Sequence, residues 1–427
     1  MRKRTIIKRS VSTVVFLCIL AGVLCGVMNL MEKKTAREKY RAFYDSGTNF
    51  DVIFMGTSHS YNTILPQEIW SSNGIASYNW AYSNCTPAED YYILQDVIRN
   101  TSPRLVVMDL YGIVEYDSFE GGNGKYRPDR IEQQHVQFDS ISLSKSKIAA
   151  VKDIFDDYEH RSDFLFNFEM YHYRWKELSR EDFEPHFSTE KGAELLLGHK
   201  AVKYKEHEVP ADFEFTSVCS EYIPRIISYC NDKGIDLLFV YLPYPAVDQK
   251  LNIAASFESA FREYGEFDYV NMTNKGILNY KTDIFKDGTH LNYIGARKVS
   301  RWLGDYITAH YPDIADHRNE SQYSIWNDDH SDYIDDLITR FQGDDLYECL
   351  MLLCNENLRG EILVTESVRQ DFEKDSCVWE FIKESGGRVK VGYTQEEILI
   401  EGDEYPLKLT VYDNRSDEEV FAAGYNL

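Results

Sequence analysis

Three residues from distant parts of the chain have the types and spacings that acyl transfer through a serine requires. Ser58 follows the apolar run Val52–Met55 after only two residues, and Asp287 and His290 are separated by two residues in a polar loop. Such chemistry needs a nucleophile, a base and a group that orients the base. Taken alone, the stretch at Ser58 is more often a capped turn, and Asp287 and His290 are more often a turn residue and a surface histidine. Together they predict Ser58 as nucleophile, His290 as base and Asp287 as its partner.

The elements that must position these residues alternate between strand and helix. Continuous apolar runs bounded by turn residues predict buried parallel strands, and 3.6-residue periodicity predicts the helices between them. Parallel strands require crossover connections, so the expected fold is an α/β, flavodoxin-like three-layer parallel sheet. In such sheets the chemistry lies at the carboxyl ends of the strands. Beyond Val52–Met55, the predicted strands are Ala76–Ala81, Leu105–Leu110, Ile235–Leu242 and Asp268–Asn271, and the helices Ala88–Arg99, Ser217–Lys233, Asn252–Glu263 and Tyr293–Ala309.

Two sequence blocks resemble the SGNH (GDSL) hydrolase superfamily. The stretch Gly56–Ser60 (Gly-Thr-Ser-His-Ser) resembles its first block, with Thr57 in place of the usual aspartate. The stretch Asp287–Asn292 (Asp-Gly-Thr-His-Leu-Asn), followed by Gly295, resembles its last block. The resemblance extends over Asp51–Ile307 and implies the same roles for Ser58, His290 and Asp287, without a metal or cofactor. The chain is most similar to the membrane-attached branch with the teichoic-acid D-alanyl transfer protein and the alginate O-acetyltransferases.

The middle blocks of that superfamily match less well. They supply backbone and side-chain donors for the oxyanion, from a glycine in the second block and from Gly-x-Asn-Asp in the third. Here the loop Asn79–Cys85 has no glycine, and Asp109–Val114 has no asparagine. The candidates for oxyanion or substrate binding are therefore Ser83, Asn84 and Gly112, with the third donor unassigned.

Two further features near the predicted site have competing interpretations. His59 adjoins the nucleophile and is expected to have a gating or structural role, because sequence neighbours usually point apart. The segment Tyr241–Pro245 (Tyr-Leu-Pro-Tyr-Pro) ends a strand beside the site. It could line a sugar-binding cleft or form a rigid loop of packed aromatic residues.

The first 41 residues predict a membrane anchor. Val11–Met31 contains no charged residue and is long enough to cross the hydrocarbon core as a helix. A cleaved signal peptide is the alternative, but no small-x-small cleavage site lies near Met31. Basic residues ahead of the span favour a cytoplasmic tail, so residues 1–31 are expected to form that tail and a single-pass anchor in the cell membrane. Residues 32–48 would be a helical stalk, with the catalytic domain outside the cytoplasm.

The remainder of the chain is acidic. Residues 1–41 carry ten Lys or Arg and two Glu, hence +8, which leaves −32 for the rest of a chain whose total is −24. That balance argues against nucleic acid as a partner. The eight cysteines show no metal-ligand spacing.

Within a domain of residues 49–312, residues 116–215 are expected to be an insertion with helices at Ser144–Tyr158 and Phe164–Leu178.

Residues 313–332 are polar and predict a linker, and residues 333–427 predict a small α+β module. Its strand-like runs are Glu348–Leu353, Arg388–Val391, Glu397–Ile400, Leu407–Tyr412 and Glu419–Ala422. Val411–Arg415, followed by Glu419–Phe421, faintly resembles the last hairpin of lectin-like modules that accompany some bacterial surface-polysaccharide proteins. The module could therefore bind polysaccharide, or serve only in folding or docking.

These observations predict a membrane-anchored serine esterase or O-acyltransferase. Its substrates would be acyl groups, most simply acetyl, of a cell-envelope or exported polysaccharide. A cell-surface polysaccharide or acyl donor, the membrane and a membrane-bound acyltransferase are the candidate partners. The alternative is a catalytically degenerate SGNH-like scaffold that binds glycan or assists assembly, because the middle-block donors are missing.

Overall fold

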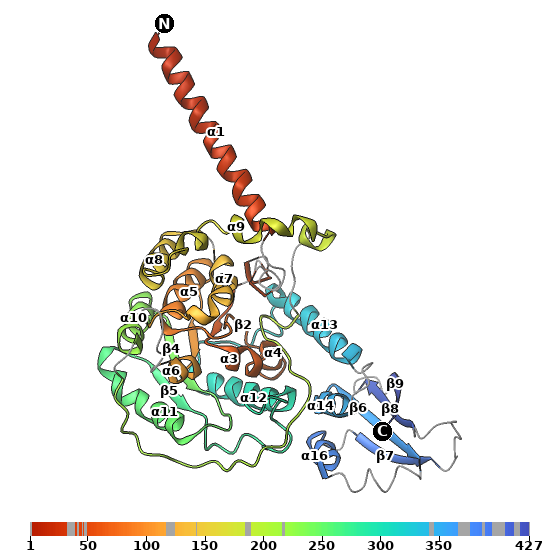
Figure 1. Cartoon of the computed structure of the whole chain (residues 1–427). Coiled ribbons are helices and arrows are strands. Elements are labelled where there is room, and N and C mark those ends of the chain that lie inside the picture. The colour runs from red at the N-terminus through yellow and green to blue at the C-terminus, as the bar shows by residue number, and fades with distance from the viewer. Residues whose placement is uncertain are drawn as a thin grey trace. The chain divides into compact units, whose positions relative to one another are not determined.

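The structure is a computed structural model (Figure 1). It describes residues 2–31, 39–40, 42–44, 46, 49–116, 124–141, 143–183, 189–215, 218–340, 346–365, 376–386, 389–394, 406–413 and 419–426. Contacts divide the chain into two compact units. The first unit comprises residues 1–48, 86–100 and 119–188, and the second comprises residues 49–85, 101–118 and 189–427.

The second unit contains the predicted five-stranded parallel sheet. The strands are β1 (Val52–Met55), β2 (Ser77–Asn79), β3 (Leu105–Asp109), β4 (Asp236–Tyr241) and β5 (Asp268–Asn271), in the order β2-β1-β3-β4-β5. All four strand pairings are parallel, which confirms the α/β fold class. In this register Met55 pairs with Met108 and Asp109 with Val240. The loops that follow β1, β3 and β4 therefore leave the sheet at one edge.

Helices cover both faces of this sheet, and the alternation of side chains along each strand shows how. Val52 and Phe54 of β1 belong to a core shared with α4 (Pro66–Asn73) and α12 (Tyr293–His310). On the other face, the ring of Phe239 in β4 contacts Phe257 of α11 (Asp248–Phe261). Also in this unit are α3 (Ser58–Thr63), α6 (Tyr111–Tyr116) and α10 (Val218–Lys233). Because both faces are covered, β1 is apolar throughout, and β3 and β4 are apolar except for Asp109 and Asp236 at one end of each.

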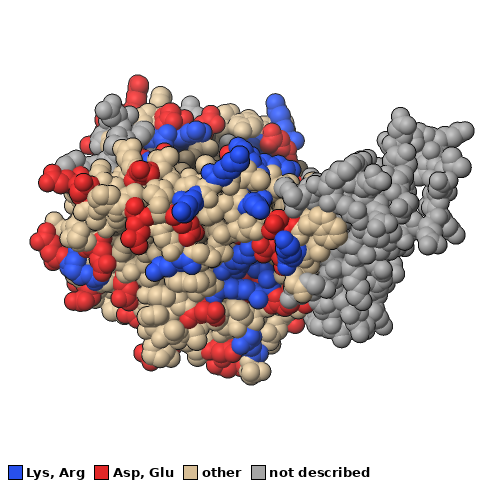
Figure 2. All heavy atoms as spheres, turned by 90° about the horizontal axis from the view of Figure 1, so that it is seen from below, with Lys and Arg blue, Asp and Glu red and all other residues tan. Residues whose placement is uncertain are grey.

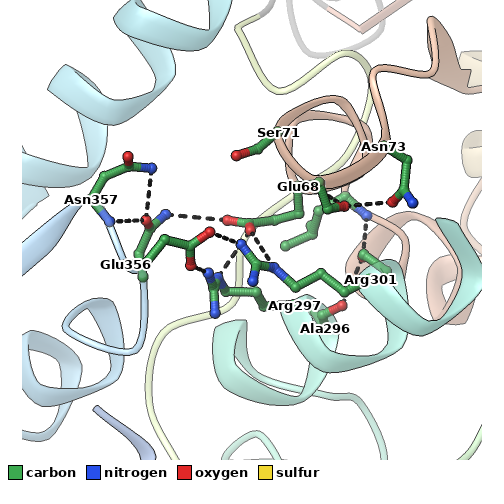
Figure 3. A network of polar contacts seen from close by, with 12 residues as sticks. Glu68, Ser71, Asn73, Ala296, Arg297, Arg301, Glu356 and Asn357 are labelled. Carbon is green, nitrogen blue, oxygen red and sulfur yellow. Dashed lines mark hydrogen bonds and ion pairs between the residues drawn. The ribbon is translucent and has the colours of Figure 1, made fainter. Parts of the chain in front are cut away.

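A buried ionic network joins α4 and α12 to residues beyond the predicted catalytic domain (Figure 3). Glu68 of α4 is 1% exposed, and its carboxylate lies 2.9 Å from Arg297 Nε and 3.6 Å from Arg301 Nε. Both guanidinium groups also pair with Glu356. Tyr293 donates a 2.7 Å hydrogen bond to Glu68, and Asn355 donates one of 3.3 Å. Although burial would raise the pKa of Glu68, the two guanidinium groups hold it below its usual range.

The expectation of a linker at residues 313–332 is wrong in its second half. Helix α13 spans Ser324–Arg340, and Trp326 in its first turn is fully buried, with its ring centroid 5.1 Å from that of Trp70. The polar residues of this stretch occupy the outer face of the helix, while Tyr333, Ile334 and Leu337 are buried on the inner face. The aspartates are thus a solvated helix surface.

The C-terminal residues form helices and a second sheet, as an α+β module requires. The sheet has the order β7-β6-β8-β9, from β6 (Leu358–Thr365), β7 (Val389–Thr394), β8 (Pro406–Asp413) and β9 (Glu419–Asn426). β6 pairs in parallel with β7 and antiparallel with β8, and β8 pairs antiparallel with β9. The strand predicted at Glu397–Ile400 lies outside the described residues.

The strand predicted at Glu348–Leu353 is wrong, since residues 346–352 form helix α14 (Leu346–Leu352). Its buried Leu350, Met351 and Leu352 belong to the same hydrophobic core as α12, as does Phe381 of α16 (Ser376–Glu384). A short apolar run fits a strand or a buried helix equally well, and packing against α12 decides between them.

The first unit is mainly helical. It contains α5 (Pro87–Asn100), α7 (Ile131–Asp139), α8 (Lys145–Ile154) and α9 (Phe168–Tyr171), with 3₁₀ turns at 128–130, 161–164, 172–176 and 180–183. α5 begins with a capping box, since Glu89 accepts a 2.7 Å hydrogen bond from the backbone N–H of Thr86. The long helix predicted at Phe164–Leu178 is instead broken into short turns. Residues 189–215, in the second unit, contain no helix or strand.

Helix α1 (Arg2–Met31) is long and apolar enough to cross a membrane. Its segment Arg9–Met28 has a mean hydropathy of 2.6, and none of it is buried. In the stalk predicted for residues 32–48, the described residues 39–40 and 42–44 are helical. Tyr40 and Phe43 are buried there, so this part is packed rather than a free polar spacer.

Both signs of charge occur on the face seen in Figure 2. Asp and Glu are spread over it and are interspersed with Lys and Arg. The net charge of −24 is therefore not gathered into one acidic patch on that face.

Candidate active site

Ser58 lies at the carboxyl end of β1, where a tight turn leads into α3. Gly56 has a φ of +125°, a conformation that L side chains rarely adopt, and a Cβ there would lie 2.9 Å from Cβ of Asp109. Thr57 is the N-cap residue of α3, and its hydroxyl accepts a 3.3 Å hydrogen bond from the backbone N–H of His59. The turn therefore needs glycine at position 56, and it makes Ser58 the first helical residue.

Asp287 and His290 lie in the loop between β5 and α12. A bridge between Ile284 and Leu291 closes this loop, and Phe285 N–H donates a 2.9 Å hydrogen bond to the carbonyl of His290. Asp287 Oδ1 accepts hydrogen bonds from the backbone N–H of Thr289 at 2.8 Å and of His290 at 3.0 Å. The carboxylate thus shapes the loop that carries the histidine.

The structure brings Ser58, His290 and Asp287 together in one line of hydrogen bonds. Nδ1 of His290 lies 2.6 Å from Asp287 Oδ2, and its Nε2 lies 2.9 Å from Ser58 Oγ. Partial burial would raise the pKa of Asp287, but the hydrogen bonds from Thr289 and His290 outweigh it and lower the pKa. An ionised carboxylate can only accept, so Nδ1 of His290 carries the proton. Nε2 is then free to accept the proton of the Ser58 hydroxyl.

The remaining residues of the last block anchor the start of α12. Asn292 is its N-cap residue: the side-chain oxygen accepts from the N–H groups of Ile294 and Gly295 at 3.1 and 3.3 Å. Its amide donates a 2.6 Å hydrogen bond to the carbonyl of Thr282. A Cβ on Gly295 would lie 2.6 Å from the carbonyl oxygen of Asp283, so only glycine allows this approach. These contacts fix the loop that ends at His290.

Asn79 is a supporting residue that sequence reasoning does not single out. It ends β2, and its side-chain amide donates to the carbonyls of Ser60 at 3.1 Å and of Ile64 at 3.0 Å. Its oxygen accepts from the N–H of Ala81 at 3.1 Å. Asn79 therefore holds α3, and with it Ser58, against the neighbouring strand. The signal that points to it is an amide side chain at the end of a short predicted strand, where a buried polar group needs hydrogen-bond partners.

The three predicted oxyanion or substrate residues lie in the segments that follow β2 and β3. Gly112 lies in the first turn of α6, where backbone N–H groups have no acceptor within the helix. A Cβ on it would come within 2.8 Å of both Thr57 Cγ2 and the carbonyl oxygen of Cys85. Asn84 has a φ of +57°, and its amide donates a 3.1 Å hydrogen bond to Ser83 Oγ. Their roles toward an oxyanion remain predictions.

Tyr244 does not present an open sugar-binding surface, because its side chain is buried at 6% exposure. Its hydroxyl accepts a 3.0 Å hydrogen bond from Tyr241, and its ring meets His59 and Tyr111 edge-on. This arrangement favours the interpretation of the segment as a rigid loop of packed aromatic residues.

A cavity of about 290 Å³ opens near the carboxyl end of β5. It is lined in part by His207, Leu251, Asn271, Thr273 and Lys275.

Within the described ranges, no group of three or more His, Cys, Asp or Glu side chains is arranged to hold a metal ion.

Comparison with known proteins adds one distant likeness. No protein-family model matches the chain, and no curated protein matches it. A crystal structure of a proposed acylhydrolase from Bacteroides fragilis is similar over 65% of this chain and 99% of its own length, with a TM-score of 0.32 and 13% sequence identity. These values are too low to assign an activity to the chain.

Proposed function

We propose that this protein is a serine acyl-esterase or O-acyltransferase that uses Ser58, His290 and Asp287. One observation carries the proposal: Ser58 Oγ, both ring nitrogens of His290 and Asp287 Oδ2 lie in series at 2.9 and 2.6 Å. These atoms come from the start of α3 and from the loop before α12, which are more than 200 residues apart in the sequence. A nucleophile, a base and a carboxylate that orients the base, in this order, are what acyl transfer through serine requires.

The reaction then proceeds in two balanced steps. Ser58 Oγ bonds to the carbonyl carbon of the acyl group while its proton passes to Nε2 of His290. The bond to the leaving alcohol breaks, that oxygen takes the proton from His290, and an acyl ester remains on Ser58. A water or sugar hydroxyl next gives its proton to His290 and attacks the ester, and Ser58 Oγ leaves with that proton. Asp287 stabilises the positive charge that His290 carries between the transfers.

The oxyanion formed in each step requires nearby donors. We assign this role to the backbone N–H groups of Ser58 and Gly112, with Ser83 and Asn84 as further candidates in the loop after β2. The first two groups lie in the first turns of α3 and α6, where they have no acceptor within their own helix. Gly112 packs directly against Thr57, next to the nucleophile.

The proposed substrates are acyl groups, most simply acetyl, on a cell-envelope or exported polysaccharide. Support comes from the resemblance of the two sequence blocks to membrane-attached SGNH enzymes and from helix α1, which would hold the enzyme in the cell membrane. A membrane-bound acyltransferase could supply the acyl group, with the catalytic unit outside the cytoplasm. Esterase and transferase differ only in whether water or sugar reaches the acyl-enzyme.

The proposal is tested by labelling the detergent-solubilised full chain with a fluorescent fluorophosphonate. The wild type should be labelled, whereas Ser58→Ala and His290→Ala should not. Ser60→Ala is the matched control, because Ser60 is a buried serine two positions away whose hydroxyl has no hydrogen-bond partner among the described residues. Labelling that persists in Ser58→Ala would refute the proposal.

The second candidate function is a glycan-binding or assembly scaffold without catalysis. The observation in its favour is the absence of the third-block asparagine from Asp109–Val114, since losing one oxyanion donor can cost roughly 10²–10³ in rate. Under this alternative a folded wild type is not labelled at any phosphonate concentration, yet still binds glycan.

A further inference from the structure

His59 lies beside the three proposed catalytic residues and is almost completely buried, at 3% exposure. Its imidazole stacks on the ring of Tyr111 with a centroid distance of 3.6 Å and an interplanar angle of 11°. Tyr244 meets it edge-on at 4.8 Å. The ring centroid of His290 lies 4.6 Å from that of His59, with the planes tilted by 36°. His59 therefore links a packed aromatic group to the ring of His290.

This aromatic group comes from the carboxyl ends of three adjacent strands. His59 follows β1, Tyr111 follows β3, and Tyr244 follows β4, and these strands are neighbours in the sheet. Residues that follow packed strands are placed more precisely than residues in long loops. A side chain held where three such strands end is well suited to fix a neighbour that comes from a loop.

His290 is such a neighbour. Its side chain is 23% exposed, and its two ring nitrogens form hydrogen bonds with Asp287 and Ser58. A ring nitrogen donates or accepts in the plane of its ring, so these bonds hold the two nitrogens and leave the faces of the ring to other contacts. A side chain packed against one face restrains the tilt of the ring further.

His59 acts on its surroundings through its ring rather than through its nitrogens. Its Nε2 is buried and has no hydrogen-bond partner among the described residues. Burial and, to a lesser extent, the nearby His290 lower the pKa of His59 well below its usual value, against an opposing effect of Asp287. The other titratable neighbours, Tyr111 and Tyr244, have pKa values raised by burial. His59 is therefore neutral when His290 gains its proton.

We propose that His59 is a positioning residue, which fixes the ring plane of His290 against Ser58 by presenting a neutral flat ring held by Tyr111 and Tyr244. The inference rests on the proposed catalytic role of Ser58 and His290. It assigns a role to the residue that follows the nucleophile in the sequence.

The test compares two substitutions at His59 in the detergent-solubilised full chain, using the kinact and KI of fluorophosphonate labelling. His59→Phe keeps a flat ring, whereas His59→Ala removes it. We expect His59→Ala to lower kinact by about 10- to 100-fold, because small misplacements of a catalytic group have effects of this size. KI should stay within about twofold. His59→Phe should restore kinact to within about threefold of wild type and melt at a higher temperature, because an unpaired buried nitrogen is removed.

Two results would overturn the assignment. If His59→Ala reacts within threefold of wild type, the ring does not position His290. If a folded His59→Phe is as slow as His59→Ala, a nitrogen acts and the ring does not suffice. Should His59→Ala fail to fold, His59→Leu fills the volume without a flat face and is expected to be as slow as alanine. Failure of the catalytic proposal is separate, since the wild type would then show no Ser58-dependent labelling.

Discussion

Replacing Asp287 by asparagine tests the proposed proton path most directly, because it changes one atom and keeps the shape of the side chain. The carboxylate receives four hydrogen bonds: from the N–H and hydroxyl of Thr289 at 2.8 and 3.2 Å, and from the N–H and Nδ1 of His290 at 3.0 and 2.6 Å. The two hydrogen bonds from Thr289 and the one from the N–H of His290 all reach Oδ1. In Asp287→Asn the amide oxygen must stay at that position, because two backbone N–H groups point at it.

The amide NH₂ of the asparagine then faces Nδ1 of His290. Two donors cannot share a hydrogen bond, so the ring proton moves from Nδ1 to Nε2. Nε2 becomes a donor to Ser58 Oγ and can no longer accept its proton. We expect the second-order rate constant for labelling to fall by about 10³- to 10⁴-fold, which corresponds to roughly 4–5.5 kcal/mol at about 1.4 kcal/mol per tenfold.

The assay is kinact/KI for fluorophosphonate labelling between pH 7 and 9, with the melting temperature measured beside it. The melting temperature should change little, because the loop keeps both backbone hydrogen bonds. Thr289→Val is the matched control: it removes one 3.2 Å bond to the same carboxylate and should cost less than tenfold. A folded Asp287→Asn protein that reacts within tenfold of wild type would refute this account of the proton path.

Three further substitutions test the fold of each unit and the candidate site. Glu68→Gln should lower the free energy of unfolding in urea by about 3–5 kcal/mol, because it leaves buried Arg297 with less counter-charge, and a loss below 1 kcal/mol would contradict this. Burial raises the pKa of Glu89 to about 8. The unfolded chain therefore loses this proton at a lower pH than the folded chain, and the free energy of unfolding falls as the pH rises from about 5 to 8. Glu89→Gln should therefore raise the melting temperature relative to wild type more at pH 8 than at pH 5, and equal differences would rule this out. Gly112→Ala should lower the labelling rate, because its Cβ would lie 2.8 Å from the carbonyl oxygen of Cys85, and an unchanged rate would remove Gly112 from the site.

The centre of the sheet can be predicted from sequence because β1, β3 and β4 contain continuous apolar runs between turn residues. The predicted strand Asp268–Asn271 coincides with β5, and Leu105–Leu110 differs from β3 by one residue. The parallel topology then places Ser58 and His290 at one edge of the sheet. The distance of 2.9 Å between Ser58 Oγ and His290 Nε2 cannot be predicted, because it depends on Asn79, Gly295 and the bridge that closes the loop of His290.

Helix α13 replaces half of the predicted linker, although its signal is present in the sequence. Trp326, Tyr333, Ile334 and Leu337 recur at helical spacing, but the aspartates between them dominate the composition and favour the prediction of a linker. The sequence of helix α14 predicts a strand for a different reason: its apolar run is too short to show a helical period. His59 and Tyr111 cannot be paired from sequence at all, because their stacking depends on two adjacent strands ending at the same level.

Helix α12 connects the candidate site with the residues that follow the predicted catalytic domain. Its N-cap, Asn292, lies two residues from His290, while Arg297 and Arg301 on its next turns join Glu68 of α4 and Glu356 beyond α14. The same helix shares its hydrophobic core with α13, α14 and α16. If this C-terminal support were absent, the buried charges of Arg297 and Glu68 would lose partners and an apolar face of α12 would meet water. Residues 324–340 and 346–358 therefore pack in the same unit as the candidate site and share the hydrophobic core of α12, the helix that follows His290.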